Sequence, residues 1–290
     1  RATASFAIPE ALTSITIKHE GKNTALSSLR VAGGSTTELT ATGWYYGNKV
    51  YSADTSFTWS VSDALGTIDE DGTFTAVQTG RDVTGTLTVT YGETSCTLPV
   101  TVGSSQPFDD TKGHWAESYI TELYYAGTLQ GSEKNGKLYY RPDASMTRQE
   151  FIVAMMRYLG TDLSAYASVQ LPFDDSGSIA SWAKSAMQAA YQLGYLTGSK
   201  TNGKLLAKPG STISRQEAMT ILSRTKDFAD ADLNVLSAFS DSGKIADWAR
   251  TALAQMTQQK IISGSKGKLN PTGKVTRAEV AKMLYMLSES

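Results

Sequence analysis

Three arginines hold the same place in a motif that recurs through the last 183 residues of the chain: Arg148, Arg215 and Arg277. Each directly follows a Thr or Ser and stands two residues before a Glu. A hydroxyl residue with Glu three positions later is a capping box, which opens a helix by satisfying two orphan backbone donors. The motif therefore predicts that each arginine lies in the first turn of a helix.

The place of these arginines is unfavourable for the helix itself, because the N-terminal end of a helix dipole is already positive. One interpretation is an anion site, in which the helix N–H groups and a bidentate guanidinium bind one carboxylate or phosphate. The alternative is structural, with each arginine paired to Asp109, to Asp174 or to an acid of a neighbouring copy. The sequence leaves both interpretations open, and one arginine could serve both.

Three tryptophans, Trp115, Trp182 and Trp248, recur in the same motif. After the second of them, Ala186 and Ala190 continue one apolar face of a predicted helix. This pattern favours a place in the core for the tryptophans. The alternative is that a Trp at the start of a helix presents a ring face as a stacking platform for a sugar.

The elements that position these residues form one unit, whose copies begin at Phe108, Phe173 and Phe239, 65 and then 66 residues apart. Such regular repetition indicates one structural unit used three times. Each copy is predicted to contain a helix, a polar loop and a second helix. The first helices are expected over 115–126, 179–193 and 245–259. Asn-Gly pairs in two of the loops favour a tight turn and a small hairpin.

The three copies are not equal. Ser240 stands where the first two copies have Asp109 and Asp174, and Lys260 replaces the glycine that ends the first helix. A left-handed conformation there would cost a residue with a Cβ roughly 1 kcal/mol, so this helix end is expected to differ. The loop before Arg277 is also shorter. The third copy is therefore expected to bind least well and to serve mainly to close the packed unit.

Residues 1–102 are predicted to form a β-sandwich, because short Thr/Val/Leu segments alternate with period two between turn residues. Asp69 to Gly72 favours a hairpin turn over a calcium loop, because the EF-hand spacing is absent. The aromatic cluster from Trp44 to Tyr51 is predicted to fill the core, with an exposed binding patch as the alternative. Residues 103–107 are small, polar and end in Pro, which is typical of a linker.

The composition excludes several classes of site. The 27 basic and 28 acidic residues give no global preference for nucleic acid, although 21 basic against 18 acidic residues after residue 103 suit an anionic partner weakly. The single Cys96 excludes an intrachain disulfide, and the distant His19 and His114 exclude a His-rich metal site. No apolar run approaches a membrane span, and no catalytic motif is present. We therefore expect no enzyme activity, no cofactor and no metal.

The run Trp59-Ser60-Val61-Ser62, Gly66-Thr67-Ile68-Asp69 and Gly72-Thr73-Phe74-Thr75-Ala76 resembles the bacterial Ig-like domains of the group 2 type. The resemblance implies that residues 1–102 form an all-β Ig-like sandwich that serves as a stalk on a surface protein. The chain begins at Arg1 with neither an initiator Met nor a signal-peptide core, which suggests a piece of a longer protein.

Phe108-Asp109-Asp110 with His114-Trp115-Ala116, the glycines Gly127 and Gly131, and the signature Thr276-Arg277-Ala278-Glu279 together resemble the S-layer homology domain. The resemblance covers residues 107–160, 172–227 and 238–290, with the linker over 103–107 ahead of it. It implies an all-α pseudo-trimer, in which three helix-loop-helix repeats pack around a shared helical bundle with grooves between them. The chain is therefore expected to be multidomain, with an all-β and an all-α part.

What this family resemblance implies is non-covalent anchoring of a surface protein to the bacterial cell wall, through an anionic, pyruvylated secondary cell-wall polysaccharide. The expected location is the extracellular cell surface, with no nucleic acid partner and no membrane insertion. Two alternatives remain: a structural protein of the surface-layer lattice, or the C-terminal anchor of a surface enzyme, such as a glycosidase, whose catalytic domain lies upstream. The expected glycan-binding residues are Arg148, Arg215, Arg277, Trp115, Trp182, Trp248, Asp109, Asp174, Gly131 and Gly198.

Overall fold

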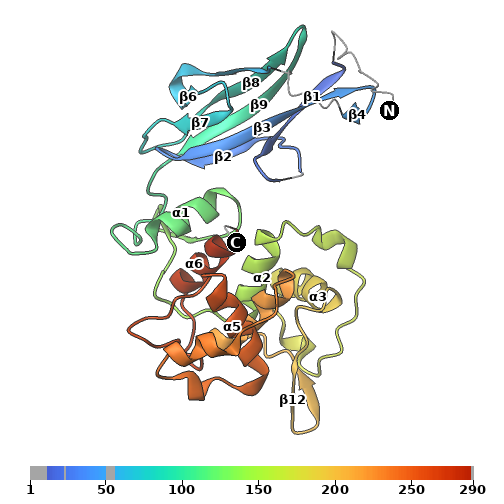
Figure 1. Ribbon diagram of the computed structural model, residues 1–290, viewed down its shortest axis with the longest axis vertical. Coiled ribbons are helices and arrows are strands. Elements are labelled where there is room, and N and C mark those ends of the chain that lie inside the picture. The colour runs from blue at the N-terminus through green and yellow to red at the C-terminus, as the bar shows by residue number, and fades with distance from the viewer. Residues whose placement is uncertain (1–11, 23, 50–55, 289–290) are drawn as a thin grey trace. The chain divides into compact units, whose positions relative to one another are not determined.

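The computed structural model describes residues 12–22, 24–49 and 56–288, and it divides into two compact units (Figure 1). The first unit ends at Pro107 and the second begins at Phe108. Each unit has its own hydrophobic core.

Two β-sheets make up the described part of the first unit. Its strands are β1 (Ser14–His19), β2 (Leu29–Ala32), β3 (Thr36–Tyr45), β4 (Asn48–Lys49), β5 (Thr58–Val61), β6 (Gly66–Ile68), β7 (Thr73–Ala76), β8 (Val83–Tyr91) and β9 (Thr94–Gly103). One sheet has the order β1-β3-β7-β6 with β4 on β3, and the other has the order β2-β9-β8-β5. The pair β2 and β9 is parallel, whereas the other pairs are antiparallel.

The core of the first unit lies between these sheets, because both contribute to one cluster of buried side chains. Along β8, Leu87 and Val89 are fully buried, whereas the alternating Thr86, Thr88 and Thr90 are not. Such period-two alternation places one face of a strand in the core. The sheets therefore pack face to face, while the finer assignment to the Ig-like type stays a prediction.

Two local features of this unit bear on predictions made from the sequence. The Asp69 turn is confirmed, since the Asp69 carboxylate accepts the Thr73 N–H at 2.8 Å and the turn joins β6 to β7. Gly103, the first residue of the predicted linker, still pairs with Ala32 in the sheet.

The aromatic cluster is only in part core. Trp44 is half-buried, but Tyr45 and Tyr46 are 40% and 77% exposed, because they lie where β3 turns into the short β4. Tyr51 lies outside the described residues. The prediction that this cluster fills the core is therefore wrong for the two described tyrosines.

The second unit contains six α-helices and two short hairpins among its described residues. The helices are α1 (Glu117–Tyr125), α2 (Arg148–Tyr158), α3 (Lys184–Gln192), α4 (Arg215–Leu222), α5 (Arg250–Gln258) and α6 (Arg277–Ser288). The hairpins are β10 (Ser132–Lys134) with β11 (Lys137–Tyr139), and β12 (Ser199–Thr201) with β13 (Lys204–Leu206). Further 3₁₀ turns connect these elements.

The fold-class prediction of an all-α second unit is wrong, because two of the polar loops fold as β-hairpins. Their turns are the Asn-Gly pairs, in which Asn135 and Asn202 take positive φ values of 55° and 50°. Both central residues of a type I′ hairpin turn need a positive φ, which Asn-Gly supplies. In the third copy the shorter loop forms only a single bridge, between Ser265 and Lys268.

The helices of different copies pack against one another: α2 against α3, α4 against α5, and α6 against α1. The segments ahead of α2, α4 and α6 also bond to each other. Met146 N–H donates to the Val275 carbonyl at 3.1 Å, Val275 N–H to Ile213 at 3.1 Å, and Ile213 N–H to Met146 at 3.0 Å. These three bonds close a ring among the copies, so no copy forms its share of the core alone.

Candidate functional site

The predicted capping boxes are confirmed in all three copies. Ser214 N–H donates to Glu217 Oε2 at 2.8 Å, and Glu217 N–H donates to Ser214 Oγ at 3.4 Å. The pairs Thr147 with Glu150 and Thr276 with Glu279 make the same reciprocal bonds. Arg148, Arg215 and Arg277 are therefore the first residues of α2, α4 and α6.

The helix N-termini are not free for an anion, contrary to one interpretation of the motif. The N–H of Arg148 donates to the Ser211 carbonyl, that of Arg215 to Gly273, and that of Arg277 to Ala144, each at 2.9 Å. The next N–H in each helix bonds a proline carbonyl, and the third belongs to the capping box. Since every acceptor of the first two donors lies in a neighbouring copy, these helix ends hold the copies together instead.

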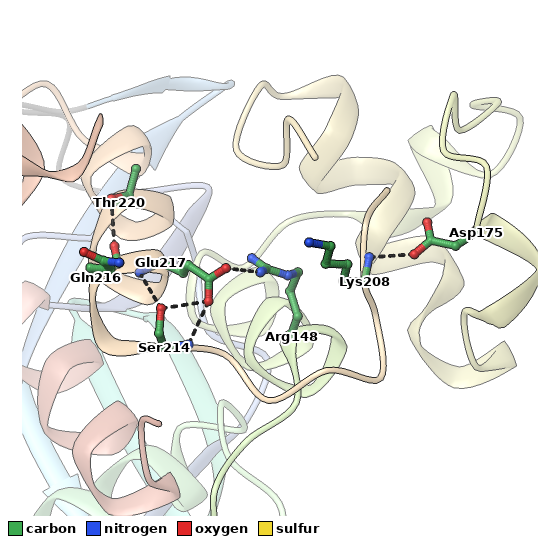
Figure 2. Close-up of polar contacts among 7 residues, drawn as sticks. All are labelled: Arg148, Asp175, Lys208, Ser214, Gln216, Glu217 and Thr220. Atoms are coloured by element: carbon green, nitrogen blue, oxygen red, sulfur yellow. Dashed lines mark hydrogen bonds and ion pairs between the residues drawn. The ribbon is translucent and has the colours of Figure 1, made fainter. Parts of the chain in front are cut away.

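The guanidinium of Arg148 forms an ion pair with Glu217 of the second copy, as Figure 2 shows. Glu217 thus uses one carboxylate oxygen for Arg148 and the other for the capping box. The Arg148 side chain is 13% exposed. Its Nε is buried and has no hydrogen-bond partner among the described residues. Arg148 is therefore neutralised in charge but not fully satisfied in hydrogen bonding.

The other two arginines are held more completely. Arg215 pairs with Glu279 at 2.7 Å, and its Nε donates to the Leu269 carbonyl at 2.9 Å. Arg277 Nε donates to the Tyr140 carbonyl at 2.7 Å, and its guanidinium lies over the Tyr140 ring, 4.4 Å from the centroid. Arg215 thus pairs with an acid of a neighbouring copy, as the structural interpretation expects, whereas the contacts of Arg277 are backbone carbonyls and an aromatic ring.

Two opposing effects act on the pKa of Glu217. Partial burial raises it, but the hydrogen bonds from Ser214 and the charge of Arg148 together outweigh burial, so the pKa lies below its ordinary value. At neutral pH this side chain is therefore ionised, as its two contacts require.

A pocket of about 320 Å³ opens beside Arg148. Its lining comes from all three copies: Arg148 from the first, Gly198 and one side of α4 from the second, and Trp248 from the third. Three of the expected glycan-binding residues therefore meet at one place. The full lining consists of Arg148, Tyr195, Leu196, Thr197, Gly198, Ser199, Leu206, Ala207, Glu217, Thr220, Ile221, Arg224 and Trp248.

The prediction that the three tryptophans lie in the core is wrong. Trp115, Trp182 and Trp248 are 55%, 58% and 58% exposed. Trp182 and Trp248 lie in 3₁₀ turns ahead of α3 and α5, so the apolar face extrapolated at 3.6 residues per turn does not reach them. In each copy the alanine that follows the Trp is the buried residue.

In the first two copies, the first Asp of the Phe-Asp-Asp motif contacts the hairpin of its own copy. Asp109 pairs with Lys137, and Asp174 accepts the Leu205 N–H at 2.7 Å. Neither lines the pocket. In the third copy Ser240 Oγ donates to the Gly267 carbonyl at 3.2 Å, so the contact with the equivalent loop is made without a carboxylate.

The second Asp of the motif, which the sequence reasoning missed, has the same role in every copy. Asp175 accepts the N–H groups of Ala207 and Lys208 at 2.8 Å each, as Figure 2 shows for Lys208. Lys208 has a φ of 52°, and the equivalents Arg141 and Asn270 are also positive. Asp110 and Asp241 make the matching bonds. Each carboxylate thus holds a strained bend in its own copy, and the bend held by Asp175 places Ala207 in the pocket wall.

The glycines Gly131 and Gly198 have a packing role. A Cβ on Gly131 would lie 2.4 Å from the Phe108 ring, and one on Gly198 would lie 2.6 Å from Phe173. Both glycines allow the hairpin to pack on the Phe that begins the motif. Gly198 also lines the pocket, whereas Gly131 does not.

Arg224 is a pocket residue that the motif scan did not single out. It lies nine residues after Arg215, and Arg157 stands at the same distance after Arg148. Burial lowers the pKa of both Arg157 and Arg224. The recurrence of this second arginine in two copies was a signal in the sequence, although Met286 takes its place in the third.

Within the described ranges, no group of three His, Cys, Asp or Glu side chains is arranged to hold a metal ion. Nor does any described helix have the length and apolarity to cross a membrane.

Three stretches of the chain, residues 107–152, 172–219 and 238–281, match the S-layer homology domain. The chain thus contains three tandem S-layer homology domains, and all ten expected site residues fall within the matched stretches. These domains indicate a location at the cell surface and a role in surface anchoring.

Proteins similar in sequence to this chain include both enzymes and a surface-layer protein. The chain is 28% identical to an amylopullulanase of Thermoanaerobacterium thermosulfurigenes over 70% of its length, and 28% identical to exoglucanase XynX of Acetivibrio thermocellus over 80%. It is 32% identical over 62% of its length to a surface-layer 125 kDa protein of Lysinibacillus sphaericus. The chain spans only 10%, 21% and 15% of the length of these proteins, so the activities in their names are stated of those proteins alone.

Proposed function

We propose that this chain, with its three tandem S-layer homology domains, anchors a surface protein to the bacterial cell wall by binding an anionic wall polysaccharide in the pocket beside Arg148. The observation that carries the proposal is the convergence of Arg148, Gly198 and Trp248, one from each domain, on a single pocket. Pyruvylated sugar is the ligand we favour, because a ketal carries both a carboxylate and a sugar ring.

The chemistry of the pocket supports a sugar ligand. The exposed Trp248 offers a ring face for stacking, and the Thr197 and Ser199 side chains can exchange hydrogen bonds with hydroxyl groups. Two arginines against one glutamate give the lining a net positive charge, which suits an anionic chain.

The test is sedimentation of the full chain with purified cell wall, before and after the secondary polysaccharide is chemically stripped. We expect the chain to pellet with intact wall only. Binding that survives stripping would refute a polysaccharide ligand and point to peptidoglycan.

A matched pair of variants localises the binding. Trp248 and Trp182 are equally exposed, at 58%, but only Trp248 lines this pocket. We expect Trp248→Ala to weaken wall binding about tenfold, as loss of one stacking contact of 1 to 3 kcal/mol implies. Trp182→Ala is the control, and an equal loss in both variants would show that the pocket beside Arg148 is not the principal site.

We propose in addition that the first unit, if it is Ig-like, acts as a stalk with no chemistry of its own. The relative named as a surface-layer protein supports a second candidate, a structural part of a surface lattice. Electron microscopy of the purified chain separates the two, since an anchor should form no ordered sheets. The enzyme relatives support a third candidate, the anchor of a larger surface enzyme.

A further inference from the structure

Two cations line the pocket, and they differ in how their charges are balanced. Arg148 is paired with Glu217, the acidic residue of the lining. Arg224 Nη1 donates only to neutral oxygens, the Tyr195 carbonyl at 2.8 Å and Thr197 Oγ1 at 3.4 Å. Within the residues that the structure describes, Arg224 has no ion-pair partner. The unbalanced positive charge of the pocket therefore belongs to Arg224.

The two arginines also differ in accessibility. The Arg148 side chain is 13% exposed, and its ion pair lies between two copies of the repeat. Arg224 is exposed at the pocket wall. An acid that drew Arg148 away from Glu217 would leave the Glu217 carboxylate short of a partner, which is costly for a partly buried charge. An acid that approaches Arg224 displaces no carboxylate.

Arg224 has hydrogen-bonding capacity to spare. A guanidinium carries five N–H donors in a planar fork, and the hydrogen bonds of Arg224 to described residues involve Nη1 alone. The Nε and Nη2 edge is the geometry that binds a carboxylate or phosphate with two parallel bonds.

From these contacts we infer that Arg224, not Arg148, is the residue that binds the acidic substituent of the ligand, and that Arg148 is a positioning residue that fixes α4 and the pocket wall. The inference rests on the proposed function and deepens it. A carboxylate and a phosphate share the required chemistry, so the experiment must separate these two sources.

The experiment measures binding of the full chain to wall glycan by calorimetry, with three probes: the released glycan, the same glycan after reduction of its carboxyl groups to alcohols, and the same glycan after removal of phosphate. We expect the unaltered chain to prefer the acidic glycan over one of the neutralised forms about tenfold, the scale of one charged hydrogen-bonded contact. The form that loses affinity identifies the acid.

Arg224→Gln should bind the acidic and neutralised glycans equally, because the group that distinguishes them is gone. Arg148→Gln should weaken both forms by the same factor and keep the preference, and Arg148→Lys, which retains the charge opposite Glu217, should keep both. Arg157→Gln is the matched control, since Arg157 holds the equivalent place in the first copy but lies outside the pocket.

The preference for the acidic glycan decides the inference. If Arg224→Gln keeps that preference, or Arg148→Gln abolishes it, the assignment to Arg224 is wrong. If the unaltered chain binds the acidic and both neutralised forms equally, the inference fails while glycan binding survives. If it binds none of the three probes, the proposed function itself fails.

Discussion

The contact between the first and second copies differs from the contact between the third and first copies, although the same motif builds both. We call the contact between the first and second copies the first joint, that between the second and third copies the second joint, and that between the third and first copies the third joint. At the first joint Arg148 meets Glu217, and a pocket opens beside it. At the third joint, Arg277 meets the Tyr140 ring and two backbone carbonyls, at Tyr140 and Gln130. The motif therefore fixes where an arginine stands, while the residues of the next copy decide what it does.

The residue under each arginine accounts for part of this difference. The equivalent positions just after the polar loops are Ala207, Leu269 and Tyr140, and all three are buried. Ala207 lines the pocket and is the smallest of the three. Tyr140 instead fills the space under Arg277 with its ring and donates its hydroxyl to the Arg277 carbonyl at 3.0 Å. Side-chain volume at one position thus separates an open joint from a filled one.

The largest effect we expect comes from removal of the capping glutamates. Glu217→Ala should destabilise the second unit by about 2 to 3 kcal/mol, because it removes a helix cap and one partner of a partly buried ion pair. Glu279→Ala should cost about the same, since Glu279 pairs with Arg215. Urea unfolding of the full chain measures both.

Glu150→Ala supplies the control for this pair of joints. Glu150 caps Thr147, but no arginine pairs with it among the described residues. The expected loss is therefore only that of the cap, about 1 kcal/mol. Equal losses for all three glutamates would contradict the difference between the joints.

A fall in pH should weaken the contact between the first and second copies, because that contact depends on the ionised Glu217 carboxylate. The pKa of Glu217 in the folded chain is below its ordinary value of 4.5. A lowered pKa means that the stabilisation is complete above the unfolded-state value and is lost as the pH falls through the folded-state value. Thermal unfolding between pH 6 and pH 3 should show this loss.

The slope of that loss tests the role of Arg148. In Arg148→Gln the charge that helps to lower the Glu217 pKa is absent, so less stability should depend on pH below about pH 4.5. Arg277→Gln is the comparison, because Arg277 has no carboxylate partner among the described residues. An unchanged slope in Arg148→Gln would show that the Ser214 hydrogen bonds alone set the pKa.

Much of the local structure followed from the sequence, and the long-range contacts did not. The capping boxes and the Asp69 turn depend on residues within four positions of each other, and both are confirmed. Arg148 and Glu217 are 69 residues apart, so no pattern within one copy pairs them. The pocket is harder still to foresee, because its lining combines residues of all three copies.

The tryptophans show why one correct pattern misled. Ala186 and Ala190 are buried, as the helical face predicted, but Trp182 precedes the α-helix in a 3₁₀ turn. The hydrophobicity of Trp and its spacing both favoured the core, and only the change of helix type excludes it.

At the third joint, Tyr140→Phe should cost about 1 kcal/mol, because it removes the hydroxyl that donates to the Arg277 carbonyl and keeps the ring under the guanidinium. Tyr139→Phe, one residue earlier in the chain, is the control and should change little. The second joint has Leu269 at this position and needs no hydroxyl. A cost near zero would mean that the ring alone fills this joint.

The smallest effect concerns the end of α5, where the sequence led us to expect a different helix end. The structure keeps the same left-handed conformation in all copies: Lys260 has a φ of 57°, against 76° for Gly127 and 79° for Gly194. The packing that follows requires this turn, since Ile261 N–H and Ile262 N–H both bond to the Met256 carbonyl and both side chains are buried. Lys260→Gly should therefore stabilise the second unit by about 0.5 to 1 kcal/mol, because glycine relieves the strain of a Cβ at positive φ. Lys260→Ala should bring no such gain, so a calorimetric comparison of the two separates backbone strain from the loss of the lysine side chain.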